Sequence, residues 1–154
     1  MSVKKIVIFD FDWSFVNENT DVYIFKQLCP KLITEIEAQR DVLDWTSLMD
    51  HIVGKMIKEE GVNIEDMSKC LRRVPYFQET FFSAKLASQC GSELYIISDA
   101  NNYYIKEVLD EHGLEPLFSR VFTNFASVED GVLRIRPYHQ ESSPHNCSLC
   151  PPNL

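Results

Sequence analysis

A short apolar segment near the start of the chain ends in two aspartates, Asp10 and Asp12, which are separated by one residue. Residues 6–9 are all apolar, so the side chains on both faces of the expected strand are apolar. This is typical of a β-strand covered on both faces in a parallel α/β sheet. Because side chains alternate along a strand, both carboxylates are expected to leave on the same side where the strand stops. Such sheets bind ligands at the carboxyl ends of their strands. The segment therefore predicts an α/β fold with an acidic pair suited to a metal ion.

Other uses of an Asp-x-Asp pair must be weighed against a site for phosphoryl transfer. A calcium-binding loop requires a third oxygen ligand and a glycine at its sixth position, where this chain has Phe15. The calcium loop is thus disfavoured. The metal-binding pair of a nucleotide-sugar glycosyltransferase, and a strand end with two solvated acids, both stay open at this point.

Composition limits the setting in which this chemistry takes place. A chain of 154 residues with 45% hydrophobic content can bury one core, so one domain with an insertion is expected. The net charge of −8 argues against a nucleic-acid partner. No segment is long and apolar enough for a signal peptide or a membrane span, so we expect a cytoplasmic protein. Five cysteines fit a reducing compartment, with three expected as small core or helix residues: Cys29, Cys70 and Cys90.

The order of expected elements indicates a sheet interrupted by one helical insertion. Helical spacing without strand alternation characterises residues 17–75. We therefore expect a doubly wound, Rossmann-like parallel sheet formed by residues 1–16 and 76–154, with residues 17–75 as an all-helical cap. The elements expected are helices over residues 44–61, 63–73, 76–89 and 102–112, and strands over residues 93–97, 120–124 and 133–136.

A second strand end favours phosphate chemistry over the alternatives. The apolar residues 93–97 are followed by Ser98 and Asp99, and a helix is expected from Asn102. A hydroxyl at the tip of a parallel strand, just before a helix, lies beside backbone N–H groups that lack an intrahelical partner. We therefore expect Ser98 to help bind phosphate.

The two strand ends together resemble the haloacid dehalogenase superfamily of phosphatases. Its first motif, Asp-x-Asp followed by Thr, Val or Ser, is matched by Asp10, Asp12 and Ser14, and its second motif, a Ser or Thr after an apolar strand, by Ser98. The chain is most similar to the branch of phosphoethanolamine/phosphocholine, pyridoxal phosphate and thiamine phosphate phosphatase-like proteins. The segments that carry this resemblance are residues 9–12, 17–21, 97–101, 122–124, 137–139 and 145–151.

The resemblance implies a mechanism that the residues are chemically able to perform. Asp10 is expected to attack phosphorus and form a phosphoaspartyl intermediate, and Asp12 to act as general acid and then as general base. Two carboxylates approach an anionic phosphate only with a cation between them, so the resemblance implies Mg²⁺ held by Asp10 and Asp12. The family pattern assigns the backbone carbonyl of Asp12 to the metal.

Two further acids near the expected reaction centre, Asp21 and Asp99, indicate the kind of substrate. Phosphoryl transfer does not require them, and an acid near phosphate is unfavourable unless it meets positive charge. We therefore expect small cationic or amine-bearing phosphomonoesters, such as thiamine monophosphate, pyridoxal 5′-phosphate or phosphocholine-like esters, and no membrane or nucleic-acid partner. Four aromatic residues are candidates for ring-face contacts with the substrate: Trp13, Trp45, Tyr103 and Tyr104.

The chain departs from the family pattern in its C-terminal part. The family's third motif, a phosphate-binding Lys, and its fourth, an acidic cluster, are expected beyond Leu154, and Lys85 and Lys106 lie in expected helices that suit surface roles. The sequence thus predicts a core incomplete at the C-terminus, with an exposed sheet edge and apolar face. The alternative function is a truncated, catalytically impaired homologue that acts as a metal- or partner-binding fragment.

The C-terminal tail carries a possible zinc-binding set. Its two thiols at x₂ spacing and two imidazoles are the ligand types of structural zinc sites: His139, His145, Cys147 and Cys150. Because no second Cys-x-x-Cys pair is present, a loop packed near the active site is favoured over zinc.

Overall fold

The structure, a computed structural model, describes residues 4–139, and its centre is a four-stranded sheet in the order β1-β2-β3-β4. Strands β1, β2 and β3 are parallel, and β4 pairs with β3 in the antiparallel sense. The strands are β1 (Ile6–Phe9), β2 (Glu93–Asn101), β3 (Phe118–Glu129) and β4 (Val132–Arg136). The predicted α/β class with a parallel, Rossmann-like sheet is confirmed, although β2 and β3 extend beyond the expected residues.

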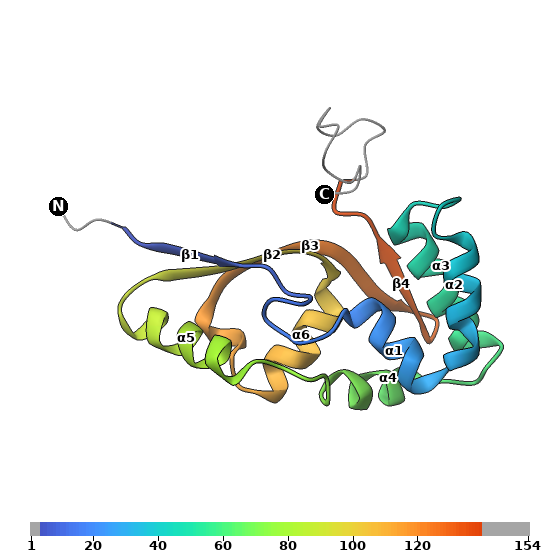
Figure 1. Ribbon diagram of the computed structural model, residues 1–154, viewed down its shortest axis with the longest axis horizontal. Helices are drawn as coiled ribbons and strands as arrows, with labels where there is room; N and C mark the ends of the chain where they lie inside the picture. The colour runs from blue at the N-terminus through green and yellow to red at the C-terminus, as the bar shows by residue number, and fades with distance from the viewer. Residues whose placement is uncertain (1–3, 140–154) are drawn as a thin grey trace.

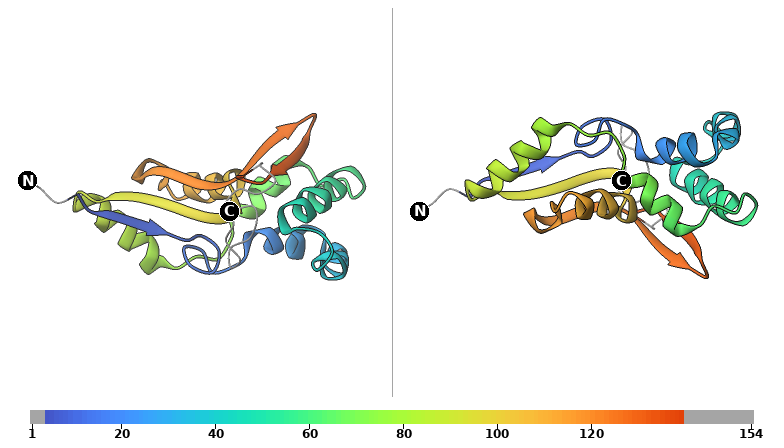
Figure 2. Two further views of the ribbon diagram at one scale, coloured as in Figure 1. Left: turned by 90° about the horizontal axis from the view of Figure 1, so that it is seen from above. Right: turned by 90° about the horizontal axis from the view of Figure 1, so that it is seen from below.

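Two helices, α5 (Gln78–Gln89) and α6 (Asn102–Glu111), cover one face of the sheet, the lower face in Figure 1. A short 3-10 helix, η2 (Glu115–Leu117), leads from α6 into β3. The strand side chains on this face, such as Leu94 and Ile96, are buried. On the opposite face Ile6, Ile8 and Ile97 stay about half exposed, at 53%, 57% and 46%. Parallel sheets are normally covered on both faces, but no helix among residues 4–139 covers this one, as the left view of Figure 2 shows.

Residues 17–75 are helical, as the sequence predicts. They contain α1 (Thr20–Leu28), the 3-10 helix η1 (Pro30–Leu32), α2 (Ile33–Gln39), α3 (Trp45–Lys58) and α4 (Ile64–Leu71). The side chains of Asp44 and Asn63 accept hydrogen bonds from backbone N–H groups of the first turns of α3 and α4. Gly61 follows α3 with φ +72°, a left-handed conformation that suits glycine. We refer to residues 17–75 as the helical insertion.

The two ends of the helical insertion meet at its base. Val16 and Tyr76 form an isolated antiparallel bridge, and the N–H of Asn17 donates to the carbonyl of Pro75 at 2.7 Å. These contacts lie at the boundaries expected for the cap. The division into core and cap remains our prediction, and the bridge shows how the chain enters and leaves the insertion at one point.

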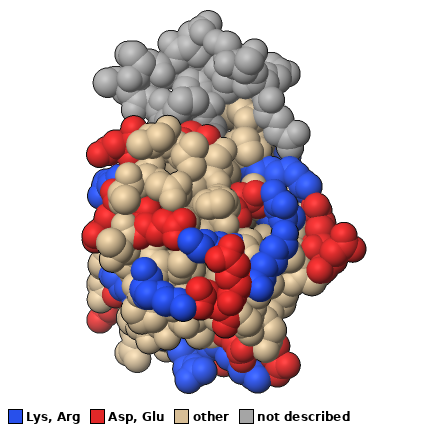
Figure 3. Space-filling view, turned by 90° about the vertical axis from the view of Figure 1, so that its right-hand side faces the viewer, with Lys and Arg blue, Asp and Glu red and all other residues tan. Residues whose placement is uncertain are grey.

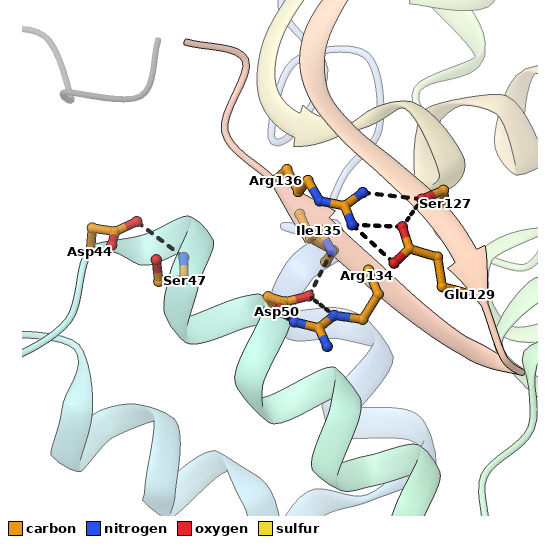
Figure 4. Close-up of polar contacts among 8 residues, drawn as sticks. All are labelled: Asp44, Ser47, Asp50, Ser127, Glu129, Arg134, Ile135 and Arg136. Atoms are coloured by element: carbon orange, nitrogen blue, oxygen red, sulfur yellow. Dashed lines mark hydrogen bonds and ion pairs between the residues drawn. The ribbon is translucent and has the colours of Figure 1, made fainter. Parts of the chain in front are cut away.

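Strand β4 of the β3–β4 hairpin packs against α3 of the helical insertion (Figure 1). The turn of the hairpin lies at Asp130 and Gly131, which have φ of 50° and 79°, in agreement with the predicted turn. Asp50 of α3 accepts hydrogen bonds from the guanidinium of Arg134, at 2.9 and 2.5 Å, and from the N–H of Ile135, at 2.7 Å (Figure 4). This contact, the Asp50 clasp, joins the insertion to the end of the sheet.

The surface at this end of the molecule carries charges of both signs. Figure 3 shows Lys and Arg side chains interspersed with Asp and Glu rather than gathered into one basic field. Ion pairs within the helical insertion include Lys31 with Glu60 and Lys55 with Glu35. Exposed ion pairs contribute about 0–1 kcal/mol each, whereas both side chains of the Lys55–Glu35 pair are partly buried.

The helices and the cysteines bear on two predictions made from composition. Within residues 4–139, none of the helices has the length and apolar character needed to cross a bilayer. Cys29 and Cys70 are buried free cysteines in the helical insertion, as expected, whereas Cys90 is exposed at the end of α5.

Candidate functional site

A turn, not a continued strand, sets the positions of the two N-terminal aspartates. Strand β1 ends at Phe9, and the N–H groups of Phe15 and Val16 fold back onto the carbonyl of Phe11. Strand alternation therefore does not extend to Asp12, contrary to our expectation. Asp10 is exposed and accepts a hydrogen bond from the Ser14 hydroxyl at 3.0 Å, whereas Asp12 is only 9% exposed. The two carboxylates thus have different environments, and such a difference allows two carboxylates to take different roles.

Asp12 is held by the first residue of α1. The hydroxyl and the N–H of Thr20 both donate to Asp12 Oδ1, at 2.8 and 3.0 Å. The N–H of Thr20 is one of the free donors at the start of a helix. Burial raises the pKa of Asp12 to about 6, although the two Thr20 bonds act in the opposite direction. A carboxyl with this pKa exchanges a proton near neutral pH, as a general acid and base must.

Asp21 follows Thr20 in α1 and is only 5% exposed. The indole N–H of Trp45, at the start of α3, donates to Asp21 Oδ2 at 2.7 Å. Burial, followed by the charge of Asp12, raises the pKa of Asp21 to about 8. The residue is therefore close to Asp12, and it also ties two helices of the insertion together.

Ser98 and Asp99 lie near Asp10 in the neighbouring strand β2. Phe9 of β1 pairs with Ile96 of β2, so the residues that follow the two positions are adjacent. Ser98 is 3% exposed, and its Oγ accepts a hydrogen bond from the N–H of Ala100 at 3.2 Å. Contrary to our expectation, β2 continues through an irregularity to Asn101, which is the N-cap of α6. Ser98 is therefore placed by this irregularity in the strand and not by the helix terminus itself.

Asn124 of β3 supports this strand end, a role that the sequence did not reveal. Its Nδ2 donates to the carbonyl of Asp99 at 2.6 Å, and its Oδ1 accepts from the N–H of Tyr138 at 2.9 Å. Thr20 was missed in the same way. Both residues lie in segments that carry the family resemblance, which was the available signal, but their roles depend on contacts across the fold.

The acids of the site repel one another. The charges of Asp10 and Asp99 both raise the pKa of Asp12, after burial, and the charge of Asp10 adds to burial in raising the pKa of Asp99. Hard oxygen donors gathered in this way fit a small divalent cation. Within residues 4–139 no group of three or more His, Cys, Asp or Glu side chains is arranged to hold a metal ion. The carboxylates of this part of the chain therefore offer an incomplete ligand set.

The lysines of α5 and α6 do not contribute to the site. Lys106 pairs with Asp110 one helical turn away, and Lys85 is exposed on α5. Both have surface positions, as predicted. Of the possible zinc ligands, only His139 belongs to the described residues, and the other three lie outside them.

The structure separates the four candidate aromatic residues into two pairs. Tyr104 is fully buried, and the Tyr103 hydroxyl shares a 2.6 Å hydrogen bond with Ser68 of α4, so both belong to packing between α6 and the insertion. Trp13 and Trp45 instead line a common pocket of about 340 Å³ beside α1 and α2.

Comparison with known proteins agrees with this arrangement. The family model Put_Phosphatase, described as "Putative Phosphatase", matches residues 5–154. A thiamine phosphate phosphatase-like protein of Arabidopsis thaliana is 36% identical over 154 residues, which cover 98% of this chain and 61% of the relative. Inorganic pyrophosphatase 2 of the same plant is 34% identical, and the match covers 97% of this chain and 53% of that protein. A pyridoxal phosphate phosphatase of Mus musculus is 30% identical, and the match covers 99% of this chain and 63% of that protein.

Solved structures show the same fold. A haloacid dehalogenase family hydrolase of Salmonella enterica superposes with a TM-score of 0.65 at 21% identity, covering 84% of this chain and 43% of that one. A phosphoserine phosphatase, solved as a phospho-aspartyl intermediate analogue, superposes with a TM-score of 0.63 at 20% identity, covering 88% and 64%. The chain spans about 61% of the plant relative's length. Because the family model matches nearly all of its residues, the chain belongs to the Put_Phosphatase family.

Proposed function

We propose that this chain carries the site of a Mg²⁺-dependent phosphatase that hydrolyses small phosphomonoesters through a phosphoaspartyl intermediate. The observation that carries the proposal is the contrast between Asp10 and Asp12. Asp10 is exposed at a strand end, and burial raises the pKa of Asp12 to about 6. One carboxylate is thus available as a nucleophile, and the other is able to carry a proton.

The proposed reaction has two displacements at phosphorus. A carboxylate oxygen of Asp10 forms a bond to phosphorus while the ester P–O bond breaks, and Asp12 gives its proton to the leaving alcohol oxygen. Asp12 then takes a proton from water, whose oxygen attacks phosphorus and releases Asp10 and inorganic phosphate. We assign the Ser98 hydroxyl, at the irregularity of the adjacent strand β2, to donate to a phosphoryl oxygen.

The metal belongs to the proposal because of the mutual repulsion of the site carboxylates. Asp10, through its carboxylate, and Asp12, through its backbone carbonyl, would hold Mg²⁺. The ion supplies charge neutralisation that lets an anionic phosphate approach an anionic nucleophile.

The proposed substrates bear a positive charge near the phosphate. The names of the relatives include thiamine phosphate and pyridoxal phosphate. Asp21 and Asp99 lie near the reaction centre, and both have raised pKa values, so a nearby cation would favour their ionised forms. Cationic esters are therefore expected to be preferred over sugar phosphates of the same charge.

The test measures phosphate release from a panel of monoesters with Mg²⁺ present, and again after chelation. Asp10→Asn is expected to abolish turnover, and Asp12→Asn to lower the rate by about 10² to 10⁴, the usual contribution of acid–base catalysis. Asp41→Asn serves as the control, since Asp41 has a side chain 95% exposed and lies in the loop after α2. Turnover by Asp10→Asn at the level of the control would overturn the mechanism.

The substrate preference is tested separately. Asp21→Asn is expected to raise KM for thiamine monophosphate and phosphocholine and to leave KM for glucose 6-phosphate unchanged. Equal use of all three esters, unaffected by this substitution, would leave a phosphatase without the proposed charge selection.

A further inference from the structure

We propose that Trp13 and Trp45 form the walls of a pocket that holds the leaving group of the substrate and selects planar aromatic leaving groups over aliphatic ones. The proposal rests on the proposed function, because it assigns the alcohol side of the same reaction. It separates two ester classes that share a positive charge: aromatic cations, such as thiazolium or pyridinium, and aliphatic ones, such as choline.

The backbone conformation of Trp13 is the first observation. Trp13 has φ of 58°, in the left-handed region, where a bulky side chain is strained. Its side chain is 60% exposed, so burial of the ring does not offset this strain. A strained residue next to a catalytic group indicates a functional constraint. The left-handed turn holds a large aromatic ring in an exposed position directly after Asp12.

The second observation is the pocket that this ring shares with Trp45. The pocket has a volume of about 340 Å³ and lies between the turn after β1 and the helices α1 and α2. Besides the two tryptophans, its lining combines apolar side chains with polar and charged ones: Val22, Ile33 and Ile36, and Asn19, Lys26, Glu37 and Arg40. A space of this size suits one heteroaromatic ring.

The third observation is how closely the pocket is connected to the general acid. Trp13 follows Asp12, and Asn19, which also lines the pocket, precedes the Thr20 that hydrogen-bonds Asp12. The N–H of Trp13 is fixed by a 3.1 Å hydrogen bond to the carbonyl of Glu18. The acid must lie beside the departing oxygen, and residues next to both Asp12 and Thr20 line this pocket, so we assign to it the group attached to that oxygen.

Trp45, which also lines the pocket, is fixed by a hydrogen bond. Its indole N–H is bonded to the buried Asp21 at 2.7 Å, which leaves the rest of the indole to form the wall. A ring held in this way loses little conformational freedom when a ligand stacks on it. Two aromatic side chains beside apolar ones favour a flat ring, whereas one ring face is enough to bind a quaternary ammonium.

The first test measures binding of the free alcohols, which does not depend on turnover. Pyridoxine and thiamine are expected to bind more tightly than choline in calorimetry. They are also expected to quench tryptophan fluorescence, which reports this pocket because Trp13 and Trp45 are the chain's 2 tryptophans. Trp13→Ala should weaken pyridoxine binding by about 3- to 30-fold, the range for loss of one ring-face contact, and Trp13→Phe should restore most of it.

The second test measures selectivity in catalysis, with a matched control. The ratio of kcat/KM for pyridoxal 5′-phosphate to kcat/KM for phosphoethanolamine should fall by about 3- to 30-fold in Trp13→Ala. The same ratio should be unchanged in Phe82→Ala, which removes an aromatic ring that is 67% exposed on α5.

The outcomes distinguish this pocket from the proposed function. If Trp13→Ala binds pyridoxine as tightly as Phe82→Ala does, or if choline binds as tightly as pyridoxine, the pocket assignment is wrong whatever the enzyme hydrolyses. If the aromatic alcohols bind through Trp13 but no ester is hydrolysed, the pocket stands as a binding site and the proposed function fails.

Discussion

Thr20 donates two hydrogen bonds to a single oxygen of Asp12, from its hydroxyl at 2.8 Å and from its N–H at 3.0 Å. Both donors point at Oδ1, so the other carboxyl oxygen is the one left to carry the proton. Thr20 is fully buried at the first position of α1. The first turn of the helical insertion therefore orients the carboxyl that we assign as the general acid.

Removal of the Thr20 hydroxyl is expected to affect esters according to their leaving group. Thr20→Val should lower kcat/KM for phosphoethanolamine by about 10-fold or more, because a hydrogen bond to a charged group contributes about 1.5–3 kcal/mol. 4-Nitrophenyl phosphate, whose leaving group needs little protonation, should be nearly unaffected. The hydrogen bonds from Thr20 lower the pKa of Asp12. Loss of the Thr20 hydroxyl should therefore also move the falling limb of the pH profile of kcat/KM to higher pH.

Thr20→Ser is the matched control, since it keeps the hydroxyl and the N–H. It should retain both the rate on phosphoethanolamine and the position of the pH limb. An equal loss on both esters in Thr20→Val would indicate a structural effect and contradict the orienting role.

Asp21 is expected to make the protein less stable as pH rises. Its pKa is about 8 in the folded state, against an ordinary value of 3.8, so between these values the folded state binds the proton that the unfolded state has lost. The contribution of Asp21 to the free energy of unfolding should be most favourable below pH 4. It should fall by up to about 1.4 kcal/mol per pH unit between pH 4 and pH 8. Asp12, with a pKa of about 6, acts in the same direction over a narrower range.

Asp21→Asn should flatten this dependence, since the amide oxygen is still able to accept from Trp45 and carries no charge. The measurement is urea unfolding at pH 5 and pH 8. Asp41→Asn, at an exposed position, should show the same slope as the unmodified chain. A slope unchanged by Asp21→Asn would show that Asp21 ionises normally in the folded protein.

The Asp50 clasp is expected to stabilise the β3–β4 hairpin against α3. Asp50→Ala leaves Arg134 and the N–H of Ile135 without their acceptor, so we expect a loss of about 1–3 kcal/mol in the free energy of unfolding. Hydrogen exchange at Ile135 should accelerate. Glu129→Gln, which disrupts the exposed pair with Arg136 in the same hairpin, should cost about 0–1 kcal/mol. Equal losses in the two variants would contradict a special role for Asp50.

Local patterns predicted much of this fold. The helix starts at Asp44 and Asn63 and the turn at Asp130 and Gly131 follow from residue chemistry within a few positions, and the structure confirms them. The parallel sheet followed from the apolar strands and the helices between them. These features depend on neighbours in sequence, so a single chain is enough to reveal them.

The rest depends on contacts between distant segments. Asp50 and Arg134 are 84 residues apart, and Asn124 reaches the carbonyl of Asp99 from 25 residues away. The extension of β2 to Asn101 is set by pairing with β3, because propensity alone would end the strand before Ser98. The separation of the four aromatic residues into packing and pocket positions likewise needs the three-dimensional structure.

Glycine is expected to stabilise the chain at position 13, the reverse of its usual effect. With φ of 58°, Trp13 occupies a conformation that costs a residue with a side chain about 1–2 kcal/mol, and glycine adopts it freely. The ring is 60% exposed, so little burial is lost with it. The free energy of unfolding, measured in urea, should therefore be about 0.5–1 kcal/mol higher for Trp13→Gly than for Trp13→Ala. This figure allows for the greater freedom of glycine in the unfolded chain. Ala38→Gly, at an exposed position in α2, should instead lose about 1 kcal/mol. If alanine at position 13 proves as stable as glycine, the turn is not strained, and the conformational reason for an exposed tryptophan beside Asp12 no longer holds.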